Sequence, residues 1–230
     1  MSMTDSPRAH RRPRRPLLTR EAVLDAAARV MERDGYAGLT MRGIADDLKV
    51  QAPALYWYVA SKEELEVLLY DHLMAGFVIR VTGDDWREHI RQAARQLRQH
   101  MRSKRDISML LPRDYAMGPN ALAQLEKSLG ILLSAGLSPR DAAYAFNLLF
   151  GYVADWASGE AVWAVRQHGG GAADQTGAVD AEALAAVDPV QYPNVAAAGE
   201  HLASFDIDGR FEFGLECMIA GLERRVSANG

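Results

Sequence analysis

The sequence QAPALYWYVASKEEL, residues 51–65, decides how the rest of this chain is interpreted. Pro53 suits the first turn of a helix, where the N–H that proline lacks would have no partner anyway. Ser61 and Glu64 form a capping box, which starts another helix. The residues between these two signals are largely aromatic and are too few to make a core helix of their own. They must therefore either fill a core or form a contact surface.

Two further helices are predicted immediately before this segment. Apolar residues recur at helical spacing over residues 23–31, with Thr19 as the N-cap and Gly35 as the residue that ends the helix. Thr40 caps a second, short helix. Its inward-facing residues are predicted to be Ile44, Ala45 and Leu48. Three short helices in about forty residues, with a short turn between the second and the third, are typical of a helix-turn-helix unit.

The remainder of the chain is also predicted to be helical. Further helices are expected after Ser61, after Asp85, and over about residues 120–135, 139–166, 195–204 and 209–226, with a short apolar piece at residues 107–111. The Gly- and Ala-rich residues 167–180 are expected to form a mobile loop. No alternation of apolar and polar residues indicates a strand. The fold class is therefore all-α, with an N-terminal three-helix helix-turn-helix head and a larger helical-bundle body.

Charge is distributed unevenly along the chain. Residues 1–62 contain 11 Lys and Arg against 7 Asp and Glu, a net charge of +4, whereas the rest contains 15 against 23, a net charge of −8. A basic head on an acidic body favours a polyanionic partner for the head. The arginine- and proline-rich start of the chain also fits a solvated, disordered tail, and the sequence leaves both interpretations open.

Composition excludes several other classes of protein. The single cysteine, Cys217, excludes an internal disulfide framework and a cysteine-rich metal site, and it fits a reducing cytoplasm. No apolar run approaches the ~18–20 residues that a membrane helix needs, and no signal peptide follows the first arginines. We therefore expect a cytoplasmic protein with no membrane partner.

In helix-turn-helix geometry, the third helix lies in the major groove of DNA. Leu55 and Val59 are then predicted to pack on the core of the head. The hydroxyls of Tyr56 and Tyr58 would reach phosphate oxygens, contacts that position a protein on DNA without reading its sequence. Trp57 stays open between core and surface. The aromatic segment is thus predicted to be partly core and partly a DNA contact.

The segment LTMRGIADDLKVQAPALYWYVASKEEL, residues 39–65, resembles the DNA-binding head of the tetracycline-repressor (TetR) family of bacterial regulators. The matched features include the break at Gly35, together with Pro53 and Lys62. The rest of the chain resembles the family in architecture, and Trp86, the LSPRDA helix start and the last helix are similar to the tetracycline repressor's own subgroup. The resemblance implies a ligand-responsive transcriptional repressor that binds a near-palindromic operator in double-stranded DNA as a homodimer. It also implies release by a hydrophobic small molecule.

The resemblance assigns roles to individual residues and to segments. DNA contacts are implied for Thr40, Arg42, Gln51, Ala52, Pro53, Ala54, Tyr56, Tyr58 and Lys62. Arg14 and Arg15 of the arginine-rich arm would reach the flanking minor groove or phosphates. The implied segments are a disordered basic arm over residues 1–18, a helix-turn-helix DNA-binding head over 19–64, and a ligand-binding and dimerisation body over 65–230.

Two features depart from the family pattern. Lys49 occupies a turn position where the family commonly has glycine, and a left-handed backbone there would cost about 1–2 kcal/mol. Ala52 and Ala54 replace polar side chains of the tetracycline repressor, although alanine can still meet a thymine methyl group. The operator sequence of that repressor is therefore not carried over to this chain.

The long helix predicted from Pro139 and the last helix are each apolar on more than one face. A helix that is apolar all round must be buried all round. We therefore expect these two helices to pair with their copies in a homodimer. The predicted interface consists of Val153, Trp156, Phe213, Met218, Ile219 and Leu222. The alternative, in which both helices lie inside one subunit, stays open.

The helices of the body are also predicted to enclose a cavity. Methionines and aromatic rings around a few polar groups suit a hydrophobic small molecule. The predicted lining is Leu97, Met101, Met109, Tyr115, Met117, Phe146 and Phe150, with Ser128 and Asn147 as polar groups. Most of these residues would equally suit an ordinary core. His100 is left open as a further lining residue.

An enzyme is the competing class of function. The six histidines show no spacing suited to metal ligation, and the chain lacks the GxSxG, P-loop and GxGxxG motifs. Asp155 and Glu160 are five positions apart and would not share a helix face. No catalytic residue, cofactor or metal is therefore predicted. The alternative is a helical small-molecule-binding protein or an enzyme in which the helix-turn-helix serves another role.

Overall fold

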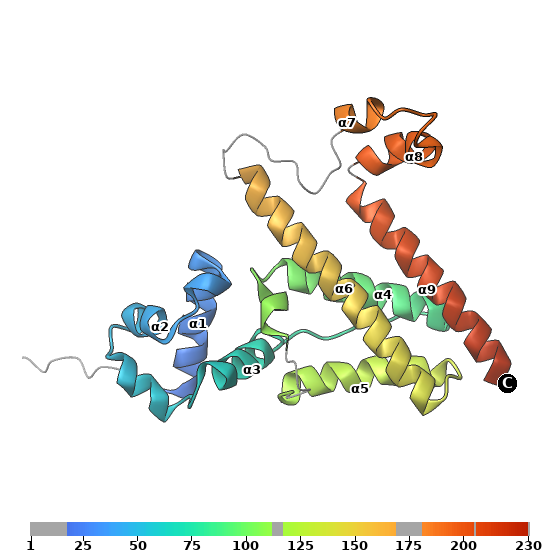
Figure 1. The fold of residues 1–230 in the computed structure, drawn as a ribbon. Coiled ribbons are helices and arrows are strands. Elements are labelled where there is room, and N and C mark those ends of the chain that lie inside the picture. The colour runs from blue at the N-terminus through green and yellow to red at the C-terminus, as the bar shows by residue number, and fades with distance from the viewer. Residues whose placement is uncertain (1–17, 112–116, 169–180, 205, 230) are drawn as a thin grey trace, which may run out of the picture.

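The structure is a computed structural model that describes residues 18–111, 117–168, 181–204 and 206–229. Within these residues every regular element is a helix, as the sequence predicted (Figure 1). The α-helices are α1 (Arg20–Asp34), α2 (Met41–Leu48), α3 (Lys62–Leu73), α4 (Trp86–Arg102), α5 (Pro119–Ser134), α6 (Pro139–His168), α7 (Ala181–Ala185), α8 (Pro193–Ala203) and α9 (Ile207–Asn229). The 3₁₀ helices are η1 (Tyr36–Gly38), η2 (Ala52–Trp57) and η3 (Ile107–Leu110).

The helices of the head begin at capping residues. Thr19 Oγ1 accepts a hydrogen bond from the backbone N–H three residues on, at 3.1 Å. Thr40 Oγ1 does the same at 3.0 Å and Ser61 Oγ at 3.1 Å. Each such bond satisfies an N–H that would otherwise lack a partner and stabilises the helix by about 1 kcal/mol. These three predicted N-caps are therefore confirmed.

The head is held together by an apolar core between α1, α2 and η2. Val30, Ile44 and Leu55 are fully buried, and Val59 is 1% exposed. Fully burying side chains of this size stabilises a fold by about 1.5–3 kcal/mol each. The predicted packing roles of Leu55 and Val59 are therefore confirmed.

The aromatic segment forms the helix η2, as the predicted third short helix, and this helix is of the 3₁₀ type. The Ala54 N–H donates to the Gln51 carbonyl at 2.9 Å, and the Tyr58 N–H donates to the Leu55 carbonyl at 2.8 Å, each bond spanning three residues. A 3₁₀ helix is tighter and is used in short pieces. Only Leu55 of η2 is buried, so a longer α-helix here would bury little more before the next helix begins.

Two turns of the head have a backbone that favours glycine. Lys49 ends α2 at φ 57° and ψ 43°, a left-handed conformation that costs a non-glycine residue about 1–2 kcal/mol. Gly35 ends α1 at φ 73° and ψ −178°. A Cβ atom at Gly35 would lie 2.8 Å from Asp106 Oδ2. Gly35 is therefore required both by its backbone conformation and by the close approach of the body.

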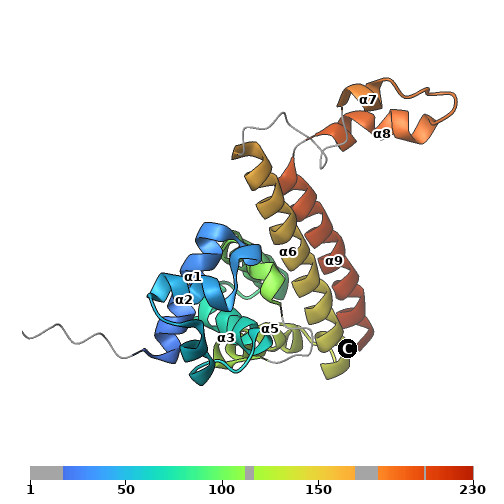
Figure 2. The same cartoon turned by 60° about the vertical axis from the view of Figure 1, so that its left-hand side comes forward.

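The long helices α6 and α9 form the spine of the body and run side by side (Figure 2). On its other sides α6 packs against α4 and α5. Phe211 of α9 is fully buried, with its ring 5.4 Å from that of Tyr152 and 6.2 Å from that of Trp156. The short helix α7, which the sequence analysis did not predict, packs on α8 beyond the ends of α6 and α9 (Figures 1 and 2).

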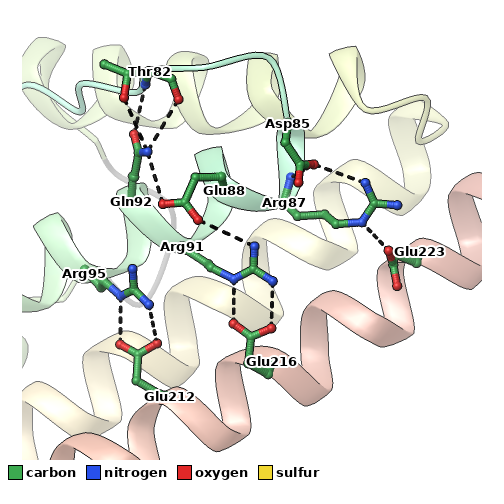
Figure 3. Close-up of polar contacts among 10 residues, drawn as sticks. All are labelled: Thr82, Asp85, Arg87, Glu88, Arg91, Gln92, Arg95, Glu212, Glu216 and Glu223. Atoms are coloured by element: carbon green, nitrogen blue, oxygen red, sulfur yellow. Dashed lines mark hydrogen bonds and ion pairs between the residues drawn. The ribbon is translucent and has the colours of Figure 1, made fainter.

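Arginines of α4 pair with glutamates of α9. Arg91 Nε and Nη2 donate to the two carboxylate oxygens of Glu216 at 2.6 and 2.7 Å. These hydrogen bonds lower the pKa of Glu216. We call the repeated pairs the arginine ladder, which consists of Arg87–Glu223, Arg91–Glu216 and Arg95–Glu212 (Figure 3). The ladder joins segments that are more than a hundred residues apart in the sequence.

The extended segment between α3 and α4 is held by glutamine side chains. Gln124 of α5 donates from Nε2 to the Phe77 carbonyl at 2.7 Å and accepts from the Ile79 N–H at 3.3 Å. Gln96 of α4 donates to the Arg80 carbonyl at 2.7 Å and accepts from the Arg80 N–H at 3.0 Å. These amides satisfy backbone groups that no helix pairs, so the segment forms a fixed wall of the body.

Candidate functional site

Most side chains predicted to contact DNA are available on the surface of the head. The exposed ones are Thr40, Arg42, Gln51, Pro53, Tyr56 and Lys62, whereas Ala52, Ala54 and Tyr58 are half-buried. Trp57 is 88% exposed, which places it on the surface and not in the core. Arg14 and Arg15 lie outside the described residues. Contact of these residues with DNA stays a prediction.

Tyr58 and Lys62 join the aromatic segment to its neighbours. The Tyr58 ring packs against the core, and its carbonyl oxygen accepts a hydrogen bond from Arg20 Nε at 3.0 Å. Lys62 Nζ lies 3.6 Å from Glu66 Oε1 and 4.8 Å from the centre of the Tyr36 ring. The Lys62 side chain remains 45% exposed. It can therefore meet a phosphate at the start of α3, where the helix N–H groups already favour an anion.

An apolar cavity lies inside the body, between α3, α4, α5 and α6. Its interior offers about 80 Å³ to the centre of a water molecule, several times the ~10–15 Å³ that one water needs. The rings of Phe146 and Phe150 are stacked in its wall, 5.5 Å apart. Of the residues predicted to line a cavity, those that border this one are Leu97, Met117, Ser128, Phe146 and Phe150.

The other predicted lining residues do not border this cavity. Met101 is buried elsewhere, at 2% exposure, near the end of α4. Met109 is 57% exposed on η3. Asn147 is exposed because it follows Phe146 on α6 and so points about 100° away around the helix. Tyr115 lies outside the described residues. The structure therefore places Met101, Met109 and Asn147 away from this cavity.

Parts of the cavity wall were not predicted from the sequence. Tyr70 and Met74 line it from the end of α3, and Ile79 lines it from the extended segment. Tyr70 and Met74 are four positions apart, so an apolar repeat on α3 could have identified them. Val153, predicted to lie at a dimer interface, lines the cavity from α6 instead.

The polar side chains that border the cavity are Tyr70, Gln124 and Ser128. Gln124 uses both ends of its amide on the extended segment. Ser128 Oγ donates to the carbonyl oxygen of Gln124 at 2.8 Å. Burial raises the pKa of the Tyr70 hydroxyl to about 12, and the charge of Asp71 acts in the same direction. Tyr70 is therefore a neutral phenol at physiological pH.

His100 does not border this cavity. Its ring stacks on that of Phe77 with centroids 4.5 Å apart, and Nε2 lies 3.0 Å from the Leu73 carbonyl oxygen. Burial lowers the pKa of His100, which favours the neutral ring. His100 therefore packs against Phe77, a residue of the cavity wall, without bordering the cavity itself.

A metal site needs several ligating side chains close together. Across the residues that the structure describes, no group of three or more His, Cys, Asp or Glu side chains is arranged to hold a metal ion. None of the described helices is both long and apolar enough to cross a membrane. Asp155 is exposed and Glu160 is buried, so these two carboxylates lie on different faces of α6, as predicted.

Both parts of the chain match known sequence families. Residues 23–66 match the bacterial regulatory proteins of the tetR family. Residues 81–226, more than half of the chain, match the tetracyclin repressor-like C-terminal domain. The chain belongs to the TetR family. The all-α fold and the resemblance predicted from the sequence are therefore confirmed.

Relatives of this TetR-family chain cover nearly its whole length. An HTH-type transcriptional regulator of Saccharopolyspora erythraea is 31% identical over 90% of this chain and 86% of its own. The HTH-type transcriptional repressor DrrR1 of Streptomyces coeruleorubidus is 29% identical over 94% of this chain and 83% of its own. Apo ActR from Streptomyces coelicolor has a TM-score of 0.81 at 26% identity, over 93% of this chain and 98% of its own. The structure of ActR in complex with actinorhodin has a TM-score of 0.78 at 29% sequence identity, over 90% of this chain and 96% of its own.

The TetR-family body buries part of the predicted dimer interface inside one chain. Val153 is 1%, Ile219 2% and Leu222 8% exposed, so their side chains are already covered within one chain. They face inward because α6 and α9 also pack on each other and on α4. Trp156 and Met218 are half-buried. Phe213 is 72% exposed, which leaves it free for an interface.

The head and the body of this TetR-family protein are joined by Arg105 and Asp106, which we call the α1 clamp. Arg105 Nη1 donates to the carbonyl oxygens of Glu32 and Arg33 at 3.0 and 2.8 Å. Asp106 Oδ2 accepts the Tyr36 N–H at 2.8 Å. Arginine suits the carbonyls at the end of α1, where the helix dipole favours a cation. The clamp therefore fixes the end of α4 to the end of α1.

An ionic cluster joins α4 to α6 and α9. Arg98 and Glu160 are each 7% exposed, and Arg98 Nε donates to Glu160 Oε1 at 2.8 Å. Arg98 Nη2 also donates to Asp208 at 2.7 Å, and Arg102 Nε lies 2.7 Å from Glu160 Oε2. The Arg98 guanidinium stands 4.3 Å from the centre of the Phe211 ring. This cluster was not predicted from the sequence, although the arginines of α4 recur at helical spacing.

Proposed function

We propose that this TetR-family protein is a cytoplasmic repressor that binds a near-palindromic operator as a homodimer and leaves it when a hydrophobic small molecule fills the cavity. The observation that carries the proposal is the course of α3. This helix starts at Lys62, beside the exposed residues of η2, and its far end lines the cavity through Tyr70 and Met74. A molecule in the cavity would therefore touch the helix that joins the head to the body.

The α1 clamp supports a second path between cavity and head. Leu97 of α4 lines the cavity, and the clamp residues Arg105 and Asp106 follow directly after α4 and hold α1. A ligand shifts an equilibrium between two arrangements only by the difference in its affinity for them. In this proposal the effector favours an arrangement in which the spacing of the two heads no longer matches the two half-sites.

Exposed apolar side chains on α6 and α9 support a homodimer. Phe213 is 72%, Tyr144 60% and Leu148 54% exposed. Large apolar side chains gathered on a surface mark interaction sites. The proposed interface therefore keeps Phe213, Trp156 and Met218 from the sequence analysis and adds Tyr144 and Leu148. A dimer also suits a major-groove reader, because it places two heads about one turn of DNA apart.

The wall of the cavity supports an aromatic effector. The rings of Phe77, Phe146 and Phe150 border it, and stacked or edge-on contacts between rings add to the burial of apolar area. ActR, a structural relative over nearly the whole chain, has been solved with actinorhodin bound. A hydrophobic aromatic compound is therefore the effector class we propose.

The same proposal assigns a role to each segment of the chain. Residues 1–18 would be a basic arm that touches the flanking DNA, residues 19–64 the DNA-binding head, and residues 65–230 the ligand-binding and dimerisation body. The proposed DNA contacts are Thr40, Arg42, Gln51, Ala52, Pro53, Ala54, Tyr56, Tyr58, Lys62, Arg14 and Arg15.

The proposal is tested by selecting binding sites from fragmented genomic DNA with the purified full chain. We expect a near-palindromic site whose half-sites are about 10 base pairs apart, occupied by a dimer. Gln51→Ala should weaken binding to this site, whereas Lys127→Ala, an exposed change on α5, should not. Deleting residues 1–16 should flatten the salt dependence by about 0.9 in log–log slope for each lost phosphate contact. Binding without sequence preference, or by a monomer, would contradict the proposal.

A further inference from the structure

The cavity offers a ligand very few polar groups. Its polar side chains are Tyr70, Gln124 and Ser128, and the rest of its lining is apolar. Gln124 uses one of its two amide N–H groups on the Phe77 carbonyl, and Ser128 donates its hydroxyl to the Gln124 carbonyl. Tyr70 is therefore the polar lining side chain that none of these bonds engages.

The surroundings of the Tyr70 hydroxyl agree with an uncommitted donor. Tyr70 is 4% exposed, and its hydroxyl makes no hydrogen bond to any residue that the structure describes. Among the described residues, the fully enclosed side-chain atom without a hydrogen bond is Glu160 Oε2, which has only its ion pair with Arg102. The Tyr70 hydroxyl is not such an enclosed atom, so it keeps contact with open space. The cavity is an open space that Tyr70 borders. Buried polar groups normally have partners, and each exception requires an explanation.

We propose that Tyr70 is a specificity-determining residue of this cavity, and that its hydroxyl donates a hydrogen bond to a carbonyl oxygen of an otherwise apolar, ring-containing effector. The inference rests on the proposed function, because it takes the cavity as the effector site. A site built to bond one polar group discriminates strongly against ligands that lack it, since the group is then left unpaired.

The neighbours of Tyr70 explain why the partner is an uncharged acceptor. The phenol is neutral, because its pKa is raised to about 12, so it can donate but carries no charge. The neighbouring residue, Asp71, directs its carboxylate toward α5. This carboxylate accepts hydrogen bonds from the Ala121 N–H and from Asn120 Nδ2, each at 2.9 Å. The carboxylate disfavours an anionic ligand close by, and its bonds fix the end of α3. Tyr70 is therefore presented from a fixed backbone.

The position of Tyr70 in the chain gives the bond a second consequence. Tyr70 lies on α3, and the first turn of α3 carries Lys62, a predicted phosphate contact. A ligand held by Tyr70 is thus bonded to the helix that joins the head to the body. Recognition of the carbonyl oxygen and displacement of the head would then involve one and the same helix.

The test compares two probes of similar shape, 1-tetralone, which carries a carbonyl oxygen, and tetralin, which lacks it. Their dissociation constants are measured with the full chain by calorimetry or ligand-observed NMR. Tyr70→Phe should weaken binding of 1-tetralone about five- to tenfold, as the loss of one hydrogen bond does. Binding of tetralin should change less than about twofold, because the ring of residue 70 is kept.

The matched control is Tyr152→Phe, the same change at a hydroxyl that is used within the protein. Tyr152 donates to the Phe211 carbonyl at 2.8 Å and does not border the cavity. Tyr152→Phe should leave the affinity for both probes unchanged and lower the melting temperature, whereas Tyr70→Phe should not lower it. A Tyr70→Phe protein that melts early would show that the hydroxyl has a structural partner and would overturn the proposal.

Two binding results would also overturn it. One is an equal change for both probes, or no change for 1-tetralone, in the Tyr70→Phe protein. The other is a wild-type protein that does not bind 1-tetralone at all. Neither result involves DNA, so the operator experiment still decides separately whether the protein is a repressor.

Discussion

The head and the body of this protein are both helical, but they are stabilised differently. In the head, Thr19, Thr40 and Ser61 each bond an N–H three residues on and so fix where a helix begins. In the body, the bond between Arg91 and Glu216 spans 125 positions of the chain. Local chemistry therefore determines the elements of the head. The arrangement of the body depends on pairings that no short stretch of sequence contains.

The largest effect is expected for a charge inside the body, and it tests which face of α9 is internal. Ile219 is 2% exposed, so Ile219→Glu buries an unpaired carboxylate at a cost of several kcal/mol. We expect loss of soluble folded protein. Phe213 is 72% exposed, so Phe213→Glu should fold normally, as circular dichroism would show, and sediment as a monomer that no longer binds operator DNA.

These two variants can also contradict the distinction between the internal and the exposed face of α9. If Ile219→Glu stays folded and only dissociates, the inner face of α9 is not held by contacts within one chain. A wild-type protein that sediments as a monomer, or a Phe213→Glu protein that remains a dimer, would remove the proposed interface.

A smaller effect is expected from truncating the core of the head. Leu55 is fully buried, so Leu55→Ala should destabilise the head by about 2–5 kcal/mol. Tyr56 is 54% exposed, so Tyr56→Phe should leave stability unchanged while weakening DNA binding. Thermal melting and operator affinity measured on both proteins check this. A large loss of stability in Tyr56→Phe would mean that η2 is oriented differently from the structure.

The smallest effect is expected from one step of the arginine ladder. The Arg91 and Glu216 side chains are 22% and 47% exposed, and solvent screens such pairs, so a double-mutant cycle with Arg91→Ala and Glu216→Ala should give a coupling of about 0.5 kcal/mol. Arg91 lowers the pKa of Glu216 below 4.5 in the folded protein. The contribution is therefore fully present above pH 4.5 and is lost as the pH falls through the lowered pKa. A coupling that is independent of pH between 6 and 3 would contradict it.

The sequence predicted the head in detail because its signals are local. Caps, the break at Gly35 and the burial of Leu55 each depend on residues a few positions apart. The sequence did not specify that the third helix is of the 3₁₀ type, because only one residue of η2 is buried and that burial is a property of the tertiary packing. Trp57 stayed open for the same reason, since a single turn of chain does not show which side meets the core.

The cavity and the interface were predicted less completely because the body helices are apolar on several faces. Val153, Ile219 and Leu222 have the composition of an interface but are covered within one chain. Tyr70 was not predicted to line the cavity, because the sequence does not distinguish an aromatic residue of the core from one that borders a cavity. From the sequence alone, the arginines of α4 suggest a solvent-exposed face, whereas in the structure they pair with glutamates of α9 (Figure 3).

The repeat of the arginine ladder has a consequence for the register of its two helices. Its arginines stand four residues apart on α4. The same spacing on α9 is shown by Asp208, Glu212 and Glu216. If α9 slid along α4 by four residues, about 6 Å, Glu212 would face Arg91 and every rung would again have a partner. Charge therefore specifies that the helices run in opposite directions, but not which turn meets which. The fully buried Phe211 ring under Arg98 has one place to fit, so packing sets the register.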